Sequence, residues 1–242
     1  MTQNPVIWND QPVYTLDSWS TILDTSSSSS GLVLLDKPLG KSSFGMVRYL
    51  KRYLNIKKIG HTGTLDPAAE GLLILCFGKA TKLADTVQAL PKVYDAVIYF
   101  GRSTDSYDRE SPWQDEQPTA HIDEQGLRRV LDEQFLGEIV QTPPLYSAIK
   151  VGGERLYKKA RRGETIEIPS RTITIYRIEI LHFRLPIAQV RIHCSKGTYI
   201  RSLARDVGAA LQSSAYLAAL RRVSIGEFNV DKAVPLSFLE TV

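Results

Sequence analysis

Residues 60–77 read GHTGTLDPAAEGLLILCF, a stretch that changes halfway from a loop containing Gly and Pro to an apolar run. The run at 72–77 predicts a buried strand, because it is apolar throughout and much too short to cross a membrane. Within the loop, glycines permit positive φ and close approach of a ligand, whereas Pro67 favours an extended Asp66. The stretch therefore predicts a carboxylate held at a fixed angle by a loop that a strand positions. A turn in which Asp66 only bonds nearby backbone N–H groups fits the spacing equally well.

Strands and helices are predicted on both sides of this stretch. Apolar runs or alternation predict further strands at 31–35, 94–100, 172–181, 188–194 and 223–230. Apolar residues at helical spacing predict helices from Ser42 or Ser43 to about Leu54, over 127–135 and over 199–211. The expected apolar face of the first helix contains Phe44, Val47, Leu50 and Leu54. Residues 101–121 carry charge and turn formers and are expected to form an exposed loop. Because no regular βαβ rhythm occurs, the expected fold is α+β with a mixed, mainly antiparallel sheet.

The first thirty residues differ in composition from the rest of the chain. They end in five serines and hold three Asp but no Lys or Arg. Such a segment buries little apolar surface, so residues 1–30 are expected to form a flexible N-terminal tail and 31–242 the folded domain. Several apolar side chains could still dock part of the tail, namely Trp8, Tyr14, Trp19, Ile22 and Leu23.

The charge of the chain is unevenly distributed. The formal net charge is +4 and the tail carries −3, so residues 31–242 carry +7. A basic body suits a polyanionic partner, because Lys and Arg that neutralise phosphates release condensed counterions. No stretch approaches the roughly 18 apolar residues of a membrane span, so no membrane partner is expected.

Cys76 and Cys194 lie in strand-like apolar runs. Their spacing provides neither a zinc-ligand set nor a disulfide framework, and a buried, reduced pair in a cytoplasmic protein is expected. The four histidines show no metal-ligand spacing, so neither a metal nor a cofactor is expected. The N-terminus lacks the order of basic, apolar and small residues that marks a signal peptide.

Residues 60–71 resemble the signature loop of the TruB-type tRNA pseudouridine synthases, whose GHTGxLDP sequence holds a nucleophilic aspartate. Further blocks that resemble this family follow in the family's order, namely GLVLLDKP at 31–38, KVY at 92–94, TPPLYSAIK at 142–150, CSKGTYIR at 194–201 and LRR at 220–222. By this resemblance the chain is identified as a member of the family, of the bacterial stand-alone type. The resemblance implies the pseudouridine synthase fold over 31–242, with the small C-terminal RNA-binding domain of many members absent or vestigial.

The resemblance implies an enzyme that isomerises uridine to pseudouridine in the T arm of tRNA, at uridine 55, on a flipped-out nucleotide. Asp66 occupies the position of the nucleophile, which must be ionised to attack either C1′ of the sugar or C6 of the base. Arg201 matches the arginine that pairs with this aspartate. Tyr94 matches the tyrosine that lies against the base, and its oxygen could help to remove the C5 proton.

The resemblance also implies that several other residues contact the RNA. His61 matches a residue near the flipped nucleotide, and Leu220 matches a wall of the uracil pocket. The remaining substrate-binding positions are Lys37, Lys150, Arg155 and Tyr199. Basic clusters on the first predicted helix and in a later segment are expected to bind the RNA backbone, through Arg48, Lys51, Arg52, Lys158 and Arg161. The expected partner is the T arm of tRNA, with no obligate protein partner and a monomeric state.

A non-catalytic tRNA-binding or tRNA-folding protein on the same scaffold is the alternative, because the basic body would support that role too. Asp66 separates the two, since a pure binder has no reason to keep a carboxylate facing phosphates. A phosphatase loop is set aside, because six residues separate Cys194 from Arg201 where that loop has five. Asp105 and Asp108 are expected to form a solvated acidic turn, not a magnesium site.

Overall fold

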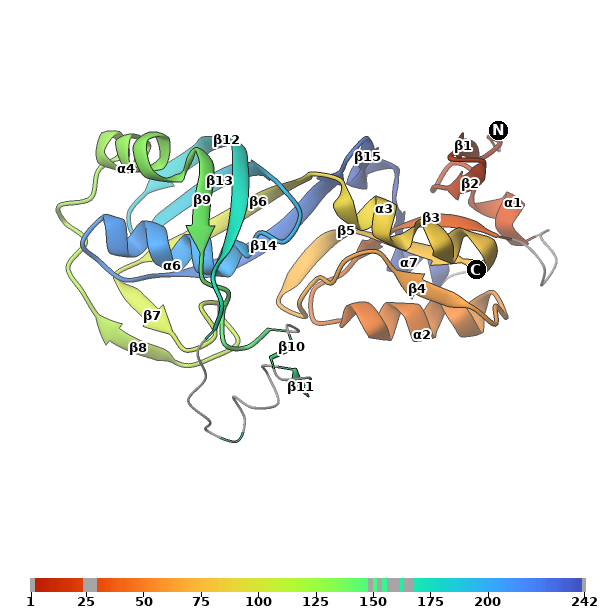
Figure 1. The fold of residues 1–242 in the computed structure, drawn as a ribbon, viewed down its shortest axis with the longest axis horizontal. Coiled ribbons are helices and arrows are strands. Elements are labelled where there is room, and N and C mark those ends of the chain that lie inside the picture. The colour runs from red at the N-terminus through yellow and green to blue at the C-terminus, as the bar shows by residue number, and fades with distance from the viewer. Residues whose placement is uncertain are drawn as a thin grey trace. The chain divides into compact units, whose positions relative to one another are not determined.

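The computed structural model describes residues 3–23, 30–147, 150–151, 154–155, 162 and 168–240. The chain divides into two compact units, here called unit 1 (Met1–Tyr94 with Arg221–Val242) and unit 2 (Asp95–Leu220). Each unit combines helices with strands that pair mainly antiparallel, which confirms the predicted α+β class (Figure 1). Among the described residues, no helix is both long and apolar enough to cross a membrane.

Unit 1 is built on a mixed group of strands. The strand β3 (Gly31–Lys37) runs antiparallel to β5 (Ala69–Phe77), which also pairs antiparallel with β4 (Ile59–His61). Beyond β3, β2 (Gln11–Tyr14) pairs parallel with it and antiparallel with β1 (Val6–Trp8). The remaining elements of this unit are α1 (Trp19–Leu23), α2 (Ser43–Tyr53), η1 (Gly78–Leu83), α3 (Ala84–Ala89), β15 (Phe228–Asn229), η3 (Val230–Lys232), β16 (Val234–Pro235) and α7 (Leu236–Leu239).

The apolar runs of β3 and β5 are continuous because both faces of these strands are covered. Their odd-numbered residues face a cluster that includes α1, α2 and α7, through Met46, Val47 and Leu50 of α2 among others. Their even-numbered residues face a second cluster with η1, α3, β15 and η3. The pair β3–β5 is therefore the rigid centre of unit 1, and the loop that begins after β4 leads directly into it (Figure 1).

The expected start of the folded domain at residue 31 is wrong for the described part of the tail. Residues 3–23 form β1, β2 and α1, and Tyr14, Trp19 and Ile22 are buried in the cluster that covers α2. The proposed anchoring by these three residues is thus confirmed. Their apolar contacts outweigh the polar composition on which the expectation rested.

Unit 2 contains β13 (Ile187–Cys194), antiparallel to β12 (Arg171–Arg184), which pairs with β9 (Gly137–Gln141). On β13 every second residue is buried, as expected for a strand with one covered face. The helix α6 (Ile200–Ala210) can pack close to Ala215 because Gly208 has no side chain; a Cβ there would lie 2.6 Å from the Cβ of Ala215. Other elements of this unit are β7 (Arg102–Thr104), β8 (Trp113–Glu116), α4 (Glu124–Val130), η2 (Leu131–Phe135), β10 (Lys150–Val151) and β11 (Glu154–Arg155).

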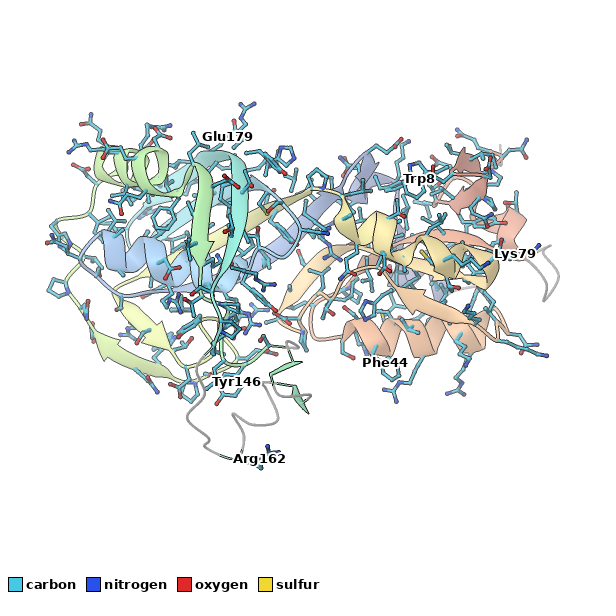
Figure 2. All side chains as sticks on the ribbon, viewed as in Figure 1. Trp8, Phe44, Lys79, Tyr146, Arg162 and Glu179 are labelled. Atoms are coloured by element: carbon cyan, nitrogen blue, oxygen red, sulfur yellow. The ribbon has the colours of Figure 1, made fainter. Side chains whose placement is uncertain are left out.

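Three local predictions differ from the structure. Residues 101–121 are not simply an exposed loop, because β7 and β8 pair antiparallel and Asp108 is buried. The last long strand, β14 (Ala215–Ile225), begins eight residues before the predicted 223 and is followed by Gly226, whose φ is +54°. It and β6 (Lys92–Phe100) contribute residues to both units. On α2, Phe44 lies on the exposed side (Figure 2), while the buried side contains Met46, Val47 and Leu50.

Trp19→Ala should destabilise the protein by about 3–5 kcal/mol, because it leaves a large cavity in the core of unit 1. Urea unfolding followed by circular dichroism measures this loss. Val6→Ala, at a side chain that is 69% exposed in the same N-terminal segment, should change the stability by less than about 0.5 kcal/mol. Equal effects of the two substitutions would contradict the docking of this segment.

Candidate active site

The loop between β4 and β5 presents Asp66 at a half-buried position. Its backbone is bonded on both sides of this residue. Thr62 donates its N–H and its hydroxyl to the carbonyl of Ile74, at 3.0 and 3.2 Å. After Asp66, the carbonyl of Pro67 accepts from the N–H of Gly40 at 2.8 Å. The loop is thus fixed to β5 at its start and to the turn after β3 at its end.

Ser43, the first residue of α2, binds the residue directly before Asp66. Its Oγ donates to the carbonyl of Leu65 and accepts from the N–H of Leu65, both at 2.8 Å. Ser43 and Leu65 are each only 3% exposed, so this hydroxyl satisfies two buried backbone groups at once. The neighbouring Ser42 caps α2 and accepts from the N–H of Gly45, and among the described residues it forms no hydrogen bond with the loop itself.

Arg222 of β14 donates hydrogen bonds to the loop residues that precede Leu65. Its guanidinium is 1% exposed and donates to three backbone carbonyls, those of Leu72 (2.7 Å), Gly63 (3.2 Å) and Thr64 (3.4 Å). The planar, forked guanidinium suits this task, since it offers five donors in fixed directions. Arg222 therefore ties the loop to β5.

Gly71 explains how β14 can come this close. Its φ is +102°, and a side chain there would lie 2.8 Å from the backbone nitrogen of Arg222 and still closer to the carbonyl oxygen of the same residue. Only glycine combines this backbone conformation with such an approach. This glycine near the start of β5 thus allows the arginine to reach the loop.

His61, the last residue of β4, lies half-buried at the start of the loop. Its Nδ1 accepts a long hydrogen bond from the N–H of Gly63, at 3.4 Å. Burial lowers the pKa of His61 below its ordinary value of 6.5, and the positive charge of Arg222 lowers it further. The imidazole is therefore neutral at neutral pH, with the proton on Nε2.

Lys37 is fully buried at the end of β3. Its ammonium donates to the carbonyls of Pro38 and Lys41, at 2.9 and 2.7 Å. These bonds support a role in shaping the turn after β3, and a direct contact between Lys37 and the substrate stays a prediction.

In unit 2, Arg201 lies in the first turn of α6 and is buried, contrary to the surface position that an arginine on a helix usually takes. Its guanidinium donates to the carbonyls of Ser106 and Tyr146, at 3.1 and 3.0 Å. Its Nη1 also lies 3.5 Å from Oδ2 of Asp108, a charge–charge contact at the limit of hydrogen bonding. The other oxygen of Asp108 accepts from the hydroxyl of Ser106 at 2.6 Å. The expected solvated acidic turn is therefore wrong for Asp108, which is an ion-pair partner.

Tyr199 precedes α6 and is fixed through its backbone. Gln141 of β9 donates to its carbonyl and accepts from its N–H, at 3.0 and 2.8 Å. The guanidinium of Arg171 lies 4.5 Å from the centre of its ring. Tyr94 of β6 and Leu220 of β14 are both half-buried strand residues.

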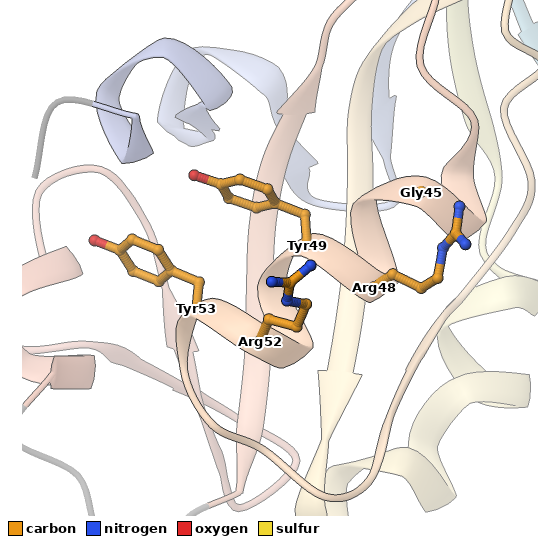
Figure 3. A pocket seen from close by; sticks show the side chains of 5 residues that line it. All are labelled: Gly45, Arg48, Tyr49, Arg52 and Tyr53. Carbon is orange, nitrogen blue, oxygen red and sulfur yellow. The ribbon is translucent and has the colours of Figure 1, made fainter.

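The predicted basic face of α2 is exposed and lies in unit 1. Arg48 and Arg52, together with Gly45, Tyr49 and Tyr53, line a hollow of about 690 Å³ (Figure 3). The rings of Tyr49 and Tyr53 stack with centres 6.1 Å apart. Lys51 is exposed on the same helix. The side chains of the second predicted cluster and its neighbours lie outside the described part of the chain, namely Lys150, Arg155, Lys158 and Arg161.

The structure thus groups the predicted residues by unit. Asp66, His61, Lys37 and the α2 cations belong to unit 1, as does Tyr94, whereas Arg201, Tyr199 and Leu220 belong to unit 2. The pairing of Arg201 with Asp66 joins residues of different units and stays a prediction.

Sequence reasoning missed three residues, Ser43, Arg222 and Asp108, in the roles that the structure gives them. The glycines of this stretch were expected to allow the close approach of a ligand, whereas Gly71 allows the close approach of Arg222. In the part of the chain that the structure describes, no group of three or more His, Cys, Asp or Glu side chains could hold a metal. The arrangement in unit 1 is that of a carboxylate carried by a loop whose backbone is immobilised.

Comparison with known proteins matches residues 51–200 to the N-terminal domain of the TruB family of pseudouridylate synthases. The tRNA pseudouridine synthase B of Flavobacterium johnsoniae is 48% identical over 216 residues, which cover 86% of this chain and 94% of that protein. The protein of the same name from Cupriavidus pinatubonensis is 46% identical, with 87% of this chain and 67% of that protein covered.

Among solved structures, a crystal structure of a Cbf5–Nop10–Gar1 complex matches with a TM-score of 0.67 at 29% identity. The match covers 89% of this chain and 54% of the solved chain, so this chain spans about half of its length.

Asp108→Asn should lower the free energy of unfolding by about 3 kcal/mol, because the buried Arg201 then loses a counter-charge. Urea unfolding measures the loss. Glu179→Gln removes a carboxylate from an exposed ion pair with Arg177 in the same unit, and should cost less than about 1 kcal/mol. An Asp108 variant as stable as the Glu179 variant would argue against the buried pair.

Proposed function

Because this chain belongs to the TruB family of pseudouridylate synthases, we propose that it isomerises uridine to pseudouridine in the T arm of tRNA, at uridine 55, with Asp66 as nucleophile. The names of its relatives support tRNA as the substrate. The observation that carries the proposal is the backbone of the Asp66 loop, which is hydrogen-bonded at Thr62, Leu65 and Pro67. Such a loop can present a carboxylate in one direction without reorganising at each turnover.

The reaction rearranges bonds within one nucleotide. The C1′–N1 bond breaks, the base rotates, and C5 bonds to C1′; the proton on C5 leaves, and N1 gains one. A carboxylate can assist by forming a transient bond to an electron-poor carbon, C1′ of the sugar or C6 of the base. Asp66 takes this role in the proposal, and no cofactor is needed for any step.

Two further residues are assigned to the chemistry. Arg201 would pair with Asp66 and orient its carboxylate. Two backbone carbonyls and Asp108 bind the guanidinium of Arg201, so its orientation is fixed within unit 2. Tyr94 would stack on the base and help to remove the C5 proton, directly or through water.

His61 is assigned to the extruded nucleotide. Unstacking a base in a folded loop costs on the order of a few kcal/mol, and a side chain that fills the vacated space offsets part of that cost. A neutral imidazole stacks between bases more readily than a solvated cation. The lowered pKa of His61, caused by burial and by Arg222, supports this role.

The backbone of the RNA would bind the outer side of α2 and the segments beside it. Residues 38–65 contain six Lys and Arg, all exposed, and no Asp or Glu. Arg48 and Arg52 border the hollow lined by Tyr49 and Tyr53, which combines cations for phosphate with aromatic faces for a base or a ribose (Figure 3). Phosphate contacts of this kind fix the position of the RNA, while the splayed uridine provides the specificity.

The rival function is a tRNA-binding or tRNA-folding protein without catalysis. The basic surface serves both functions equally. We favour catalysis because the loop holds a carboxylate within a basic unit. The negative charge of this carboxylate repels phosphates, so a protein that only binds RNA has no use for it. The monomeric state, the independence from a protein partner and the cytoplasmic location remain predictions.

Asp66→Asn should abolish isomerisation while tRNA still binds, because an amide is a far weaker nucleophile than a carboxylate. Release of tritium from tRNA labelled at C5 of uridine measures the reaction, and filter binding measures the dissociation constant. Glu70→Gln, which removes a carboxylate from the same loop region, serves as the control and should retain activity. A wild-type protein that binds tRNA and releases no tritium would favour the rival function.

The double substitution Arg48→Ala and Arg52→Ala should weaken tRNA binding and reduce the slope of log Kd against log salt by about 1.5 to 2, because two phosphate contacts are lost. Binding at a series of salt concentrations measures this slope. The matched control is Lys79→Ala with Lys82→Ala, two exposed cations of η1. If both double variants change the slope equally, the effect comes from net charge and α2 is no specific contact.

A further inference from the structure

We propose that Ser43 and Arg222 act together as positioning residues that set the direction of the Asp66 carboxylate. The pair is called the loop clamp below. This inference rests on the proposed function and concerns the same site. Neither residue is assigned to contact the RNA; both act through the backbone of the loop.

The bonds that the clamp makes with the loop end on three consecutive residues. Arg222 binds the carbonyls of Gly63 and Thr64, and Ser43 binds both backbone groups of Leu65. These are the residues directly before Asp66, so the peptide planes leading to it are fixed. Pro67 restricts Asp66 from the other side. The main-chain direction at Asp66 is therefore determined from both neighbours.

The buried charge of Arg222 destabilises the protein unless the loop carbonyls accept its hydrogen bonds. Within the described residues, no carboxylate forms an ion pair with this buried guanidinium. A buried charge needs its donors accepted, and here the acceptors are carbonyls of the loop and of β5. Turning the loop away would leave the guanidinium without two of its three acceptors. The energetics thus favour one loop conformation.

A structural role alone does not require this arrangement. The strands β3 and β5 already pair along the whole of β3 without Arg222 or Ser43. Two of the three bonds of Arg222, and both bonds of Ser43, are made with the loop and not with the sheet. Burial lowers the pKa of His61, and the charge of the same guanidinium lowers it further, so Arg222 also influences a second residue that is assigned to the nucleotide.

The test compares four single variants of the full chain in two matched pairs. Arg222→Lys keeps the charge but loses the fork, and its control is Arg221→Lys, one residue earlier on the same strand, where the side chain pairs with Asp36 and Glu70. Ser43→Ala removes both bonds to Leu65, and its control is Ser42→Ala, which removes only the helix cap.

The rate of tritium release is measured in a single turnover at saturating tRNA, the dissociation constant by filter binding, and folding by thermal unfolding. We expect a rate about 100-fold lower for Arg222→Lys and a smaller but clear loss of rate for Ser43→Ala. The reason is that displacing a catalytic group by about 1 Å can lower the rate about 100-fold. The affinity for tRNA should change little. The controls should keep the wild-type rate. If Arg222→Lys fails to fold, the Ser43 and Ser42 pair decides the question.

The outcomes are distinguishable from failure of the proposed function. A wild-type protein that releases no tritium refutes that function, whatever the variants do. An active wild type, with clamp variants as fast as their controls, overturns the clamp alone. Clamp variants that bind tRNA weakly yet react at the wild-type rate once bound also overturn it, because the residues would then serve binding.

Discussion

The buried guanidinium of Arg222 is the constraint on which the loop of unit 1 depends. A cation that is 1% exposed must find acceptors inside the protein, and three carbonyls provide them. The approach of β14 to β5 that this requires is possible only because Gly71 has no side chain. One glycine and one arginine, far apart in the sequence, thus determine the path of the residues that lead to Asp66.

The remainder of unit 1 makes this constraint rigid. Both faces of β3 and β5 are covered by apolar clusters. The strand β5, whose Leu72 carbonyl accepts a hydrogen bond from Arg222, therefore cannot shift without exposing core residues. One cluster holds α2 against the sheet, and the first residue of α2 binds Leu65. Docking of the N-terminal segment completes the same cluster. Packing energy distributed over the unit is therefore used to fix one short stretch of backbone.

The regular elements were predictable because their signals are local. The apolar runs of β3 and β5, the alternation of β13 and the capped start of α2 were all found at nearly the right residues. The errors come from contacts between distant residues. Asp108 looked solvated because its partner Arg201 lies far along the chain, and the N-terminal segment looked flexible because its few anchors stand among polar residues.

The candidate site shows the same division. Family motifs identified Asp66 and include Arg222 in the LRR block at 220–222. Nothing in the sequence shows that Ser43 and Arg222 bind the loop, because only the folded backbone brings them to it.

The central claim is that the Asp66 loop is already fixed in the protein without tRNA. Amide hydrogen exchange at Leu65 tests this claim most directly. The N–H of Leu65 is buried and bonded to Ser43, so it should exchange as slowly as the amides of β5, with or without tRNA. Fast exchange in the protein alone, slowed only when tRNA is added, would show that the substrate orders the loop and would contradict this account.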